Sequence, residues 1–186
     1  DLNDAITQAN SATGGTTTSF TIAGGITING GTASDFTTLL ANETASQLAI
    51  TDQNLTVDDG TISVANARAL SAATTGTVTG TITSGTTIAA MVDGSSGLTE
   101  TSNAYTITIS SGDAEATAAN LTSLYGKTSV AVDASAVTQI TGTVAEANIV
   151  YAAGASEITG LGNEAVVTTE TGLNDGSAEG TVATLN

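Results

Sequence analysis

The chain repeats a pattern of one short helix followed by two short strands, and this pattern limits its possible folds more than any other feature. The pattern is clearest over residues 113–141. Within it, Ala114, Ala118, Leu121 and Tyr125 fall on one face at helical spacing. The residues that follow alternate with the period of two that strands require. The stretch therefore predicts an amphipathic helix and then two strands.

The ends of this helix carry residues that suit helix termini. Asp113 is suited to the N-cap, and Gly126 is suited to the left-handed position that ends a helix. Beyond the helix, Val130 and Val132 are expected to point to the same side of the first strand, and residues 137–140 are expected to form the second.

Units of this kind recur along the whole chain. Helix starts fall near residues 2, 33, 64, 86, 113, 143 and 173, and their steps of about 22 to 31 residues are typical of solenoids. Each unit is too small to bury its own apolar face, so stacked neighbours must bury it and pair their strands in parallel. We therefore expect an α/β repeat solenoid over residues 1–186, with about seven helix-strand-strand coils. The coils are expected near 1–31, 32–62, 63–85, 86–112, 113–142, 143–172 and 173–186, the last of them incomplete.

Alternatives to this fold are an all-β sandwich and a β-helix, because short helices and short strands are easily confused in such sequences. Helix ends give the firmest local predictions. Thr143 and Glu146 fit a reciprocal capping box, and Gly154 is placed to end that helix. Thr32 or Ser34 is expected to cap the helix that starts near residue 33. Strands are expected at 19–23, 26–28, 48–51, 55–57, 77–79, 81–83, 98–101, 105–109, 157–159 and 165–168.

The chain has few large side chains, with 3 Tyr, 2 Phe and no Trp. Small residues suit a narrow core of thin, repeating layers better than a wide globular core. Phe36, Tyr125 and Tyr151 lie on predicted helix faces, so we expect them to belong to this core.

Charge is strongly one-sided, with 18 acidic residues against Arg68 and Lys127, and a net charge of -16. Nucleic acid is therefore excluded as a partner, because phosphate contacts need Lys and Arg. The natural counter-ion is a divalent cation. Acidic turns recur at 58–60, 93–94, 112–113 and 174–176, and either calcium binding or ordinary turn chemistry explains them. We favour turn chemistry, so no cofactor is expected, with calcium as the alternative.

Residue types needed for catalysis are scarce. The chain has no His and no Cys, which excludes the Ser-His and Cys-His arrangements of nucleophilic catalysis. A Gly-rich phosphate loop with Lys is also missing. We expect no enzyme, and we identify no catalytic, cofactor-binding or metal-binding residue. No run of 18 apolar residues is present, so no membrane insertion is expected in this segment.

Two stretches, 130–143 and 158–166, resemble the repeat regions of giant Thr/Ala/Gly-rich bacterial cell-surface or adhesin-like proteins of the cyanobacterial type. The resemblance mainly covers residues 62–172 and transfers no functional residue. It implies an exported protein with a structural or adhesive role. The absence of an initial Met, and the pattern that runs on at both termini, lead us to expect a segment of a longer protein.

Taken together, these features predict a non-enzymatic structural or adhesive repeat segment of an extracellular fibre, a surface layer or a giant surface protein. Expected partners are copies of itself or adjacent repeats, joined end to end, and cell-surface polysaccharide. The alternative is a surface-binding module, either an ice-binding face of threonines or a phage receptor-binding fibre. Alternating threonines at 77–79, 81–83 and 106–108 motivate the ice-binding version.

Overall fold

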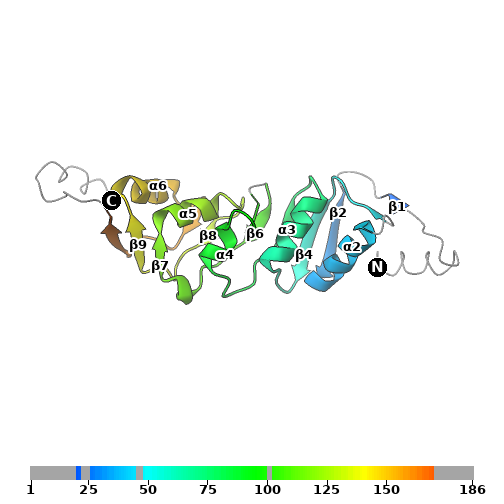
Figure 1. The fold of residues 1–186 in the computed structure, drawn as a ribbon, viewed down its shortest axis with the longest axis horizontal. Coiled ribbons are helices and arrows are strands. Elements are labelled where there is room, and N and C mark those ends of the chain that lie inside the picture. Colours follow the sequence, from blue (N-terminus) through cyan, green and yellow to red (C-terminus); the bar gives the residue numbers. More distant parts are fainter. Residues whose placement is uncertain (1–19, 22–25, 45–47, 100–101, 170–186) are drawn as a thin grey trace, which may run out of the picture.

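A computed structural model describes residues 20–21, 26–44, 48–99 and 102–169 of the chain. These residues form an elongated α/β structure that runs from β2 and α2 near one end of the long axis to α6 and β11 near the other (Figure 1). The described α-helices are α2 (Ala33–Thr44), α3 (Val64–Ala73), α4 (Ile88–Val92), α5 (Ala118–Tyr125) and α6 (Val144–Ala153), with one 3-10 turn, η1 (Ser111–Asp113). The strands are β1 (Phe20–Thr21), β2 (Thr27–Thr32), β3 (Leu48–Ala49), β4 (Asn54–Asp59), β5 (Val78–Thr81), β6 (Ala104–Thr106), β7 (Glu115–Thr117), β8 (Val132–Asp133), β9 (Gln139–Gly142), β10 (Ile158–Thr159) and β11 (Ala165–Thr168).

Every strand pairing within the described part of the chain is parallel. The strands group into short sheets with the orders β2-β4-β5-β6, β7-β9-β11, β8-β10 and β1-β3. Parallel neighbours need a crossover connection. A helix lies in the connection from β2 to β4, from β4 to β5, from β5 to β6, from β7 to β9 and from β9 to β11.

The expected repeat solenoid of about seven helix-strand-strand coils is wrong. Strand pairing is divided among separate short sheets, and the units between helices differ in content. Residues 77–83, expected as two strands, contain the single strand β5, and residues 98–99 form no strand. The sequence steps between helices are regular, but the segments between the helices are not copies of one another.

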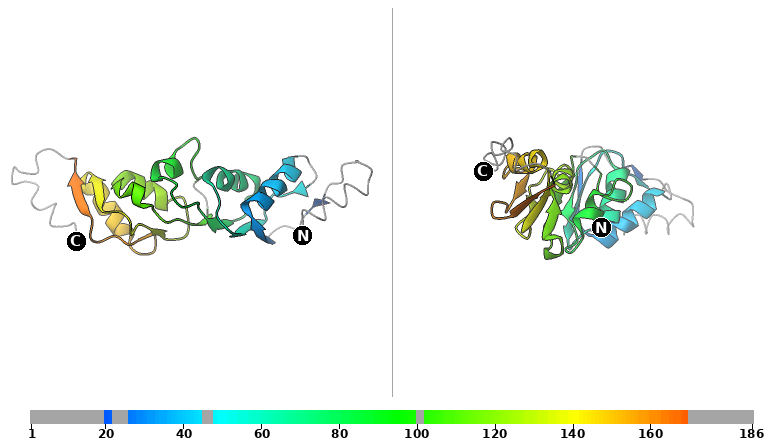
Figure 2. Two further views of the ribbon diagram at one scale, coloured as in Figure 1. Left: turned by 90° about the horizontal axis from the view of Figure 1, so that it is seen from below. Right: turned by 60° about the vertical axis from the view of Figure 1, so that its left-hand side comes forward.

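An all-β sandwich or β-helix is wrong as well, because five α-helices alternate with the strands over the described residues. The two views of Figure 2 show these helices beside the strands along the length of the fold. The helix expected near residue 2 and the unit expected from 173 lie outside the described residues.

Hydroxyl side chains start the helices. Thr143 accepts a hydrogen bond at its side-chain Oγ1 from Glu146 N (3.2 Å), and Glu146 Oε2 accepts one from Thr143 N (2.8 Å). This confirms the predicted capping box, and α6 ends at Gly154 with a φ of 67°. Thr32 and Asp35 form the same reciprocal pair of hydrogen bonds at α2: Thr32 N donates to Asp35 Oδ2 (2.8 Å), and Asp35 N donates to Thr32 Oγ1 (3.3 Å). Thr32 rather than Ser34 therefore caps that helix.

The unit at 113–141 was predicted incorrectly at its start. Residues Glu115–Thr117 form strand β7, and α5 begins only at Ala118, where Thr117 is the N-cap. Asp113 instead lies in η1, and its side chain accepts a hydrogen bond from Ile88 N (3.1 Å) at the start of α4. The helix begins late because residues 115–117 pair with β9, and the Thr117 hydroxyl then accepts the capping hydrogen bond from Asn120 N (3.2 Å).

The end of the same unit also differs from the prediction. Gly126 caps α5 with a φ of -68°, which is an ordinary right-handed value. Val130 is exposed, whereas Val132 is fully buried in β8, so the two side chains do not share a surface. The following strand, β9, begins at Gln139, two residues later than expected.

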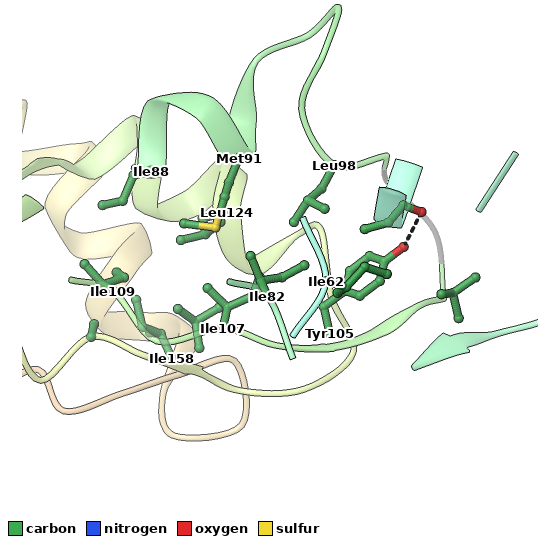
Figure 3. Close-up of a cluster of buried hydrophobic side chains, with 14 of the residues drawn as sticks. Ile62, Ile82, Ile88, Met91, Leu98, Tyr105, Ile107, Ile109, Leu124 and Ile158 are labelled. Atoms are coloured by element: carbon green, nitrogen blue, oxygen red, sulfur yellow. Dashed lines mark hydrogen bonds between the residues drawn. The ribbon is translucent and has the colours of Figure 1, made fainter. Parts of the chain in front are cut away.

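One continuous cluster of apolar side chains runs through the described fold. Figure 3 shows Ile88 and Met91 of α4 and Leu124 of α5 facing Ile107 and Ile109. Phe36 is buried, as predicted, and Tyr125 and Tyr151 are partly buried against the cluster. The cluster is narrow and aliphatic because aromatic residues are few.

Close packing of one turn on its neighbour leads to a prediction about glycines. A Cβ at Gly76 would press against the backbone carbonyl of Gln53, whereas a Cβ at Gly94 would meet nothing within 4 Å. We expect Gly76→Ala to lower the free energy of unfolding by about 1–3 kcal/mol through overpacking. Gly94→Ala is the matched control and is expected to change it by under about 0.5 kcal/mol. Urea denaturation measures both, and equal effects would contradict the packing at Gly76.

Candidate functional site

The acidic turns were the first candidates for a binding site. In the turn that follows α4, a single oxygen of the Asp93 carboxylate accepts hydrogen bonds from the hydroxyl and backbone N–H of both Ser95 and Ser96, at 2.7–2.9 Å. These bonds, the Ser95 hydroxyl first among them, hold the pKa of Asp93 well below its ordinary value. The carboxylate is thus used to close its own turn.

Other acidic turns also have local roles. Asp113 receives the N–H of Ile88, and Asp58 and Asp59 lie exposed at the end of β4 before Gly60, whose φ is 88°. Among the described residues, no three acidic side chains gather where they could hold a metal ion together. The turn at 174–176 lies outside the described residues.

Threonines form short rows across the strands. The register places threonine beside threonine on neighbouring strands at three points, and each row is then interrupted or ends. Ala104 follows Thr79 in one row, and Val167 follows Thr141 in another. The cross-strand pairs are Thr56–Thr79, Thr81–Thr106 and Thr117–Thr141.

The strongest surface feature is the end of the fold formed by β11 and α6, which we call the β11 end. Strand β11 is the edge of its sheet in the described part of the chain, because it pairs with β9 on one side. Val167 of this strand is 43% exposed and Ile149 of α6 is 52% exposed. Within the part of the chain that the structure describes, the β11 end therefore combines a strand edge with exposed large apolar side chains.

A hollow of about 210 Å³ lies beside α6. Its walls combine apolar side chains with glycine backbone, and they are formed by Val150, Tyr151, Gly154, Ala155, Ile158, Thr159, Gly160 and Leu161. The hydroxyl of Tyr151, one of these lining residues, donates a hydrogen bond to Glu164 Oε2 (3.0 Å), and Gly162 N donates to the same carboxylate at 2.8–2.9 Å. This pairing fixes the turn that leads into β11.

The Tyr151–Glu164 pair gives a pH prediction. Burial, with the hydrogen bond and the charge of Glu164, raises the pKa of Tyr151 to about 12. A raised folded-state pKa means that the pair stabilises the fold fully below about pH 10, the ordinary tyrosine pKa, and that this contribution is lost as pH rises through about 12. We expect alkaline absorbance titration to show a tyrosinate step near pH 12 that Tyr151→Phe removes, separate from the still later step of Tyr105, whose pKa burial raises further. Glu164→Gln should shift that step to lower pH, and an unmoved step would contradict the pairing.

The opposite end of the described fold, which we call the β2 end, has a similar character. Among the described strands, β2 is one edge of the four-stranded sheet, and Ile26, directly before it, is 44% exposed. Ile28, whose side chain faces the core, is only partly buried, whereas its neighbour Leu55 on β4 is fully buried. As far as the structure describes the chain, apolar groups at both ends are thus incompletely covered.

No residue of either end was singled out from the sequence as a functional residue. The strand 165–168 and the helix that contains Ile149 were predicted correctly. These local predictions do not say whether another strand or helix lies alongside. No sequence signal in these segments distinguishes an end from an interior layer.

Comparisons of the chain with protein-family models, with curated proteins and with solved structures gave no match. The helices described by the structure are all too short or too polar to cross a membrane.

Proposed function

We propose that the chain is a non-enzymatic structural or adhesive segment of an extracellular or cell-surface protein. The observation that carries the proposal is the elongated fold, with a strand edge and exposed apolar side chains at each end of the described part. Such a segment extends a longer structure when its ends meet other material. Its partners in this role are copies of itself, adjacent segments and cell-surface polysaccharide.

Composition supports the same proposal. The net charge of -16 keeps exposed segments soluble and mutually repelling. The sequence has no His and no Cys, which are common catalytic residues. Its resemblance to the repeat regions of giant bacterial surface proteins favours an extracellular location.

Surface display of the chain on its source cells is the test. An antibody raised against the 186-residue chain should label intact cells, and protease treatment of intact cells should remove the label. A cytosolic protein released only on lysis serves as the control. Labelling that appears only after the cells are broken would overturn the proposal.

Resistance to trypsin is a further expected property. Arg68 and Lys127 are the only basic residues of the chain. The Arg68 guanidinium Nη1 donates a hydrogen bond to Gly97 O (3.1 Å), and Lys127 is 8% exposed. We expect the native chain to stay intact under conditions in which the urea-unfolded chain is cut into 1–68, 69–127 and 128–186, as seen by mass spectrometry. A glutamate-specific protease acts as the control, and equally rapid cleavage of both states by trypsin would contradict the prediction.

A second candidate function is the binding of an ordered surface such as ice by the threonine pairs on neighbouring strands. The pairs Thr56–Thr79 and Thr81–Thr106 place hydroxyl groups at the regular spacing of a sheet. Thermal hysteresis of the purified chain, lost in Thr79→Lys, would support this function. The related possibility of a phage receptor-binding fibre predicts a trimer, which sedimentation equilibrium detects.

A further inference from the structure

We propose that the β11 edge of one copy of the chain pairs in parallel with the β2 edge of a second copy, so that copies join head to tail. The proposal rests on the structural function above, and it adds the partner and the contact. In Figure 1 the two edges lie toward opposite ends of the described fold, so the same contact can repeat from copy to copy.

Hydrogen-bonding groups of β11 point alternately toward β9 and away from it. Ala165 N donates to Thr138 O (2.9 Å) and Thr169 N donates to Gly142 O (2.9 Å). The odd-numbered residues therefore direct their backbone groups toward β9. In a parallel ladder the residues between them direct their N–H and C=O groups to the other side. Val166 therefore offers both groups at the outer edge.

In strand β2 the even-numbered residues, not the odd-numbered ones, direct their backbone groups toward the existing neighbour. Asn54 N donates to Ile26 O (2.9 Å), so the even-numbered residues Ile26 and Ile28 direct their backbone hydrogen-bonding groups toward β4. Thr27 and Asn29 then direct their backbone groups outward. Placing Val166 opposite Ile28 allows Val166 N to donate to Thr27 O and Asn29 N to donate to Val166 O.

The same register aligns the apolar layers. Val166 pairs with fully buried Ile140 inside its sheet, and Ile28 pairs with fully buried Leu55, but Val166 and Ile28 are themselves only partly buried. Setting Val166 beside Ile28 continues the core from one copy into the next. A slip of one residue loses both the hydrogen bonds and the apolar match.

Exposed apolar surface supports contact between these two ends. Of the four large apolar side chains exposed in the described part of the chain, three lie at the ends: Ile26 at the β2 end and Ile149 and Val167 at the β11 end. Strand β11, Ala-Val-Val-Thr, has none of the lysines or prolines that protect sheet edges. Strand β2 has a register shift after Asn29, which confines the new pairing to Thr27–Asn29.

Net charge sets the conditions for this contact. Copies that each carry -16 repel one another, and salt shortens the range of that repulsion. We therefore expect the 186-residue chain to be mainly monomeric at low salt. At high salt it should form species larger than dimers, because a head-to-tail contact does not close.

Sedimentation velocity of paired edge variants tests the proposal. Val167→Glu and, independently, Thr168→Pro block the β11 edge, whereas Asn29→Pro and Thr27→Glu block the β2 edge. Two variants for each edge, checked by circular dichroism, keep the result independent of one substitution's effect on folding. Thr79→Glu adds the same charge to the interior strand β5 and is the matched control.

Each edge variant alone should self-associate at least about tenfold more weakly than the unmodified chain and the Thr79→Glu control. An equimolar mixture of a β11 variant with a β2 variant should form dimers and nothing larger, because one intact edge of each kind remains. Dimers that only the β11 variants abolish would indicate symmetric β11 pairing and overturn the proposal.

A chain that stays monomeric at every salt concentration would also overturn the proposal, as would edge variants that assemble like the control. Both outcomes are separate from the proposed function. A monomeric chain found on the cell surface refutes this inference and leaves the function standing, whereas an assembling chain found only inside cells refutes the function.

Discussion

Leu121→Ala is expected to lower the free energy of unfolding by about 2–4 kcal/mol. Leu121 is fully buried on α5, the helix that contacts both α4 and α6 in the row of helices. Removing its isobutyl group loses transfer free energy and leaves a cavity in a core that has few large side chains to fill it. Urea denaturation followed by circular dichroism measures the change.

Thr106→Ala is the control for this prediction. Thr106 is exposed on β6 with its side chain away from the core, so the change should stay within about 0.5 kcal/mol. Similar losses for both variants would show that α5 does not press the Leu121 face onto the sheets.

Asn103→Ala is expected to cost about 2–4 kcal/mol for a different reason, the loss of partners for buried polar groups. Asn103 is 2% exposed, and its Oδ1 accepts a hydrogen bond from Val78 N (2.8 Å). Its Nδ2 donates to Ser71 Oγ and to the Tyr105 hydroxyl, both at 3.0 Å. Alanine leaves the buried Val78 N–H without its acceptor, and the same denaturation experiment measures the loss.

Tyr105 extends this network, because its hydroxyl donates to Ala67 O (3.1 Å) on α3, the hydrogen bond that is dashed in Figure 3. Asn163→Ala, at an exposed position, is the control and should have little effect. A loss below about 1 kcal/mol for Asn103→Ala would mean that water replaces the amide.

Local features of this fold could be predicted from the sequence where one short-range interaction decides them. Thr143 and Glu146 form their capping box because both partners lie within one helical turn. The strand predicted at 165–168 likewise coincides with β11. Such features depend on a few neighbouring residues and not on the rest of the chain.

Features that depend on distant partners could not be predicted in this way. Residues 115–117 have the composition of a helix start, yet they form β7 because β9 supplies a parallel partner along their length. Asp113 looks like an N-cap, but the N–H that its side chain accepts belongs to Ile88, 25 residues earlier. The regular spacing of helix starts says nothing about how sheet pairing is divided, so the solenoid prediction failed.

The candidate site could likewise be predicted only in the features that its own strands determine. The sequence predicted strands at 26–28 and 165–168, where β2 and β11 lie and where the structure places Ile28 and Val166 beside buried neighbours. Whether such a residue is covered from one side or from two is set by what lies beyond the strand, and that information is not in the strand's own sequence. Exposure of Ile149 and Val167 therefore emerged only from the structure.

The stacking of strands along the long axis also determines how this chain would carry tension. Hydrogen bonds between paired strands lie across the strands, so a pull applied along the stack breaks them one pair at a time rather than all together. Gln139 and its partner Ala165 are 26 residues apart in sequence (165 - 139) but adjacent in the sheet. Detaching β11 from β9 would replace a spacing of about 5 Å with about 85 Å of extended chain. Such a chain would lengthen gradually under load, as an extensible spacer does and a rigid rod does not.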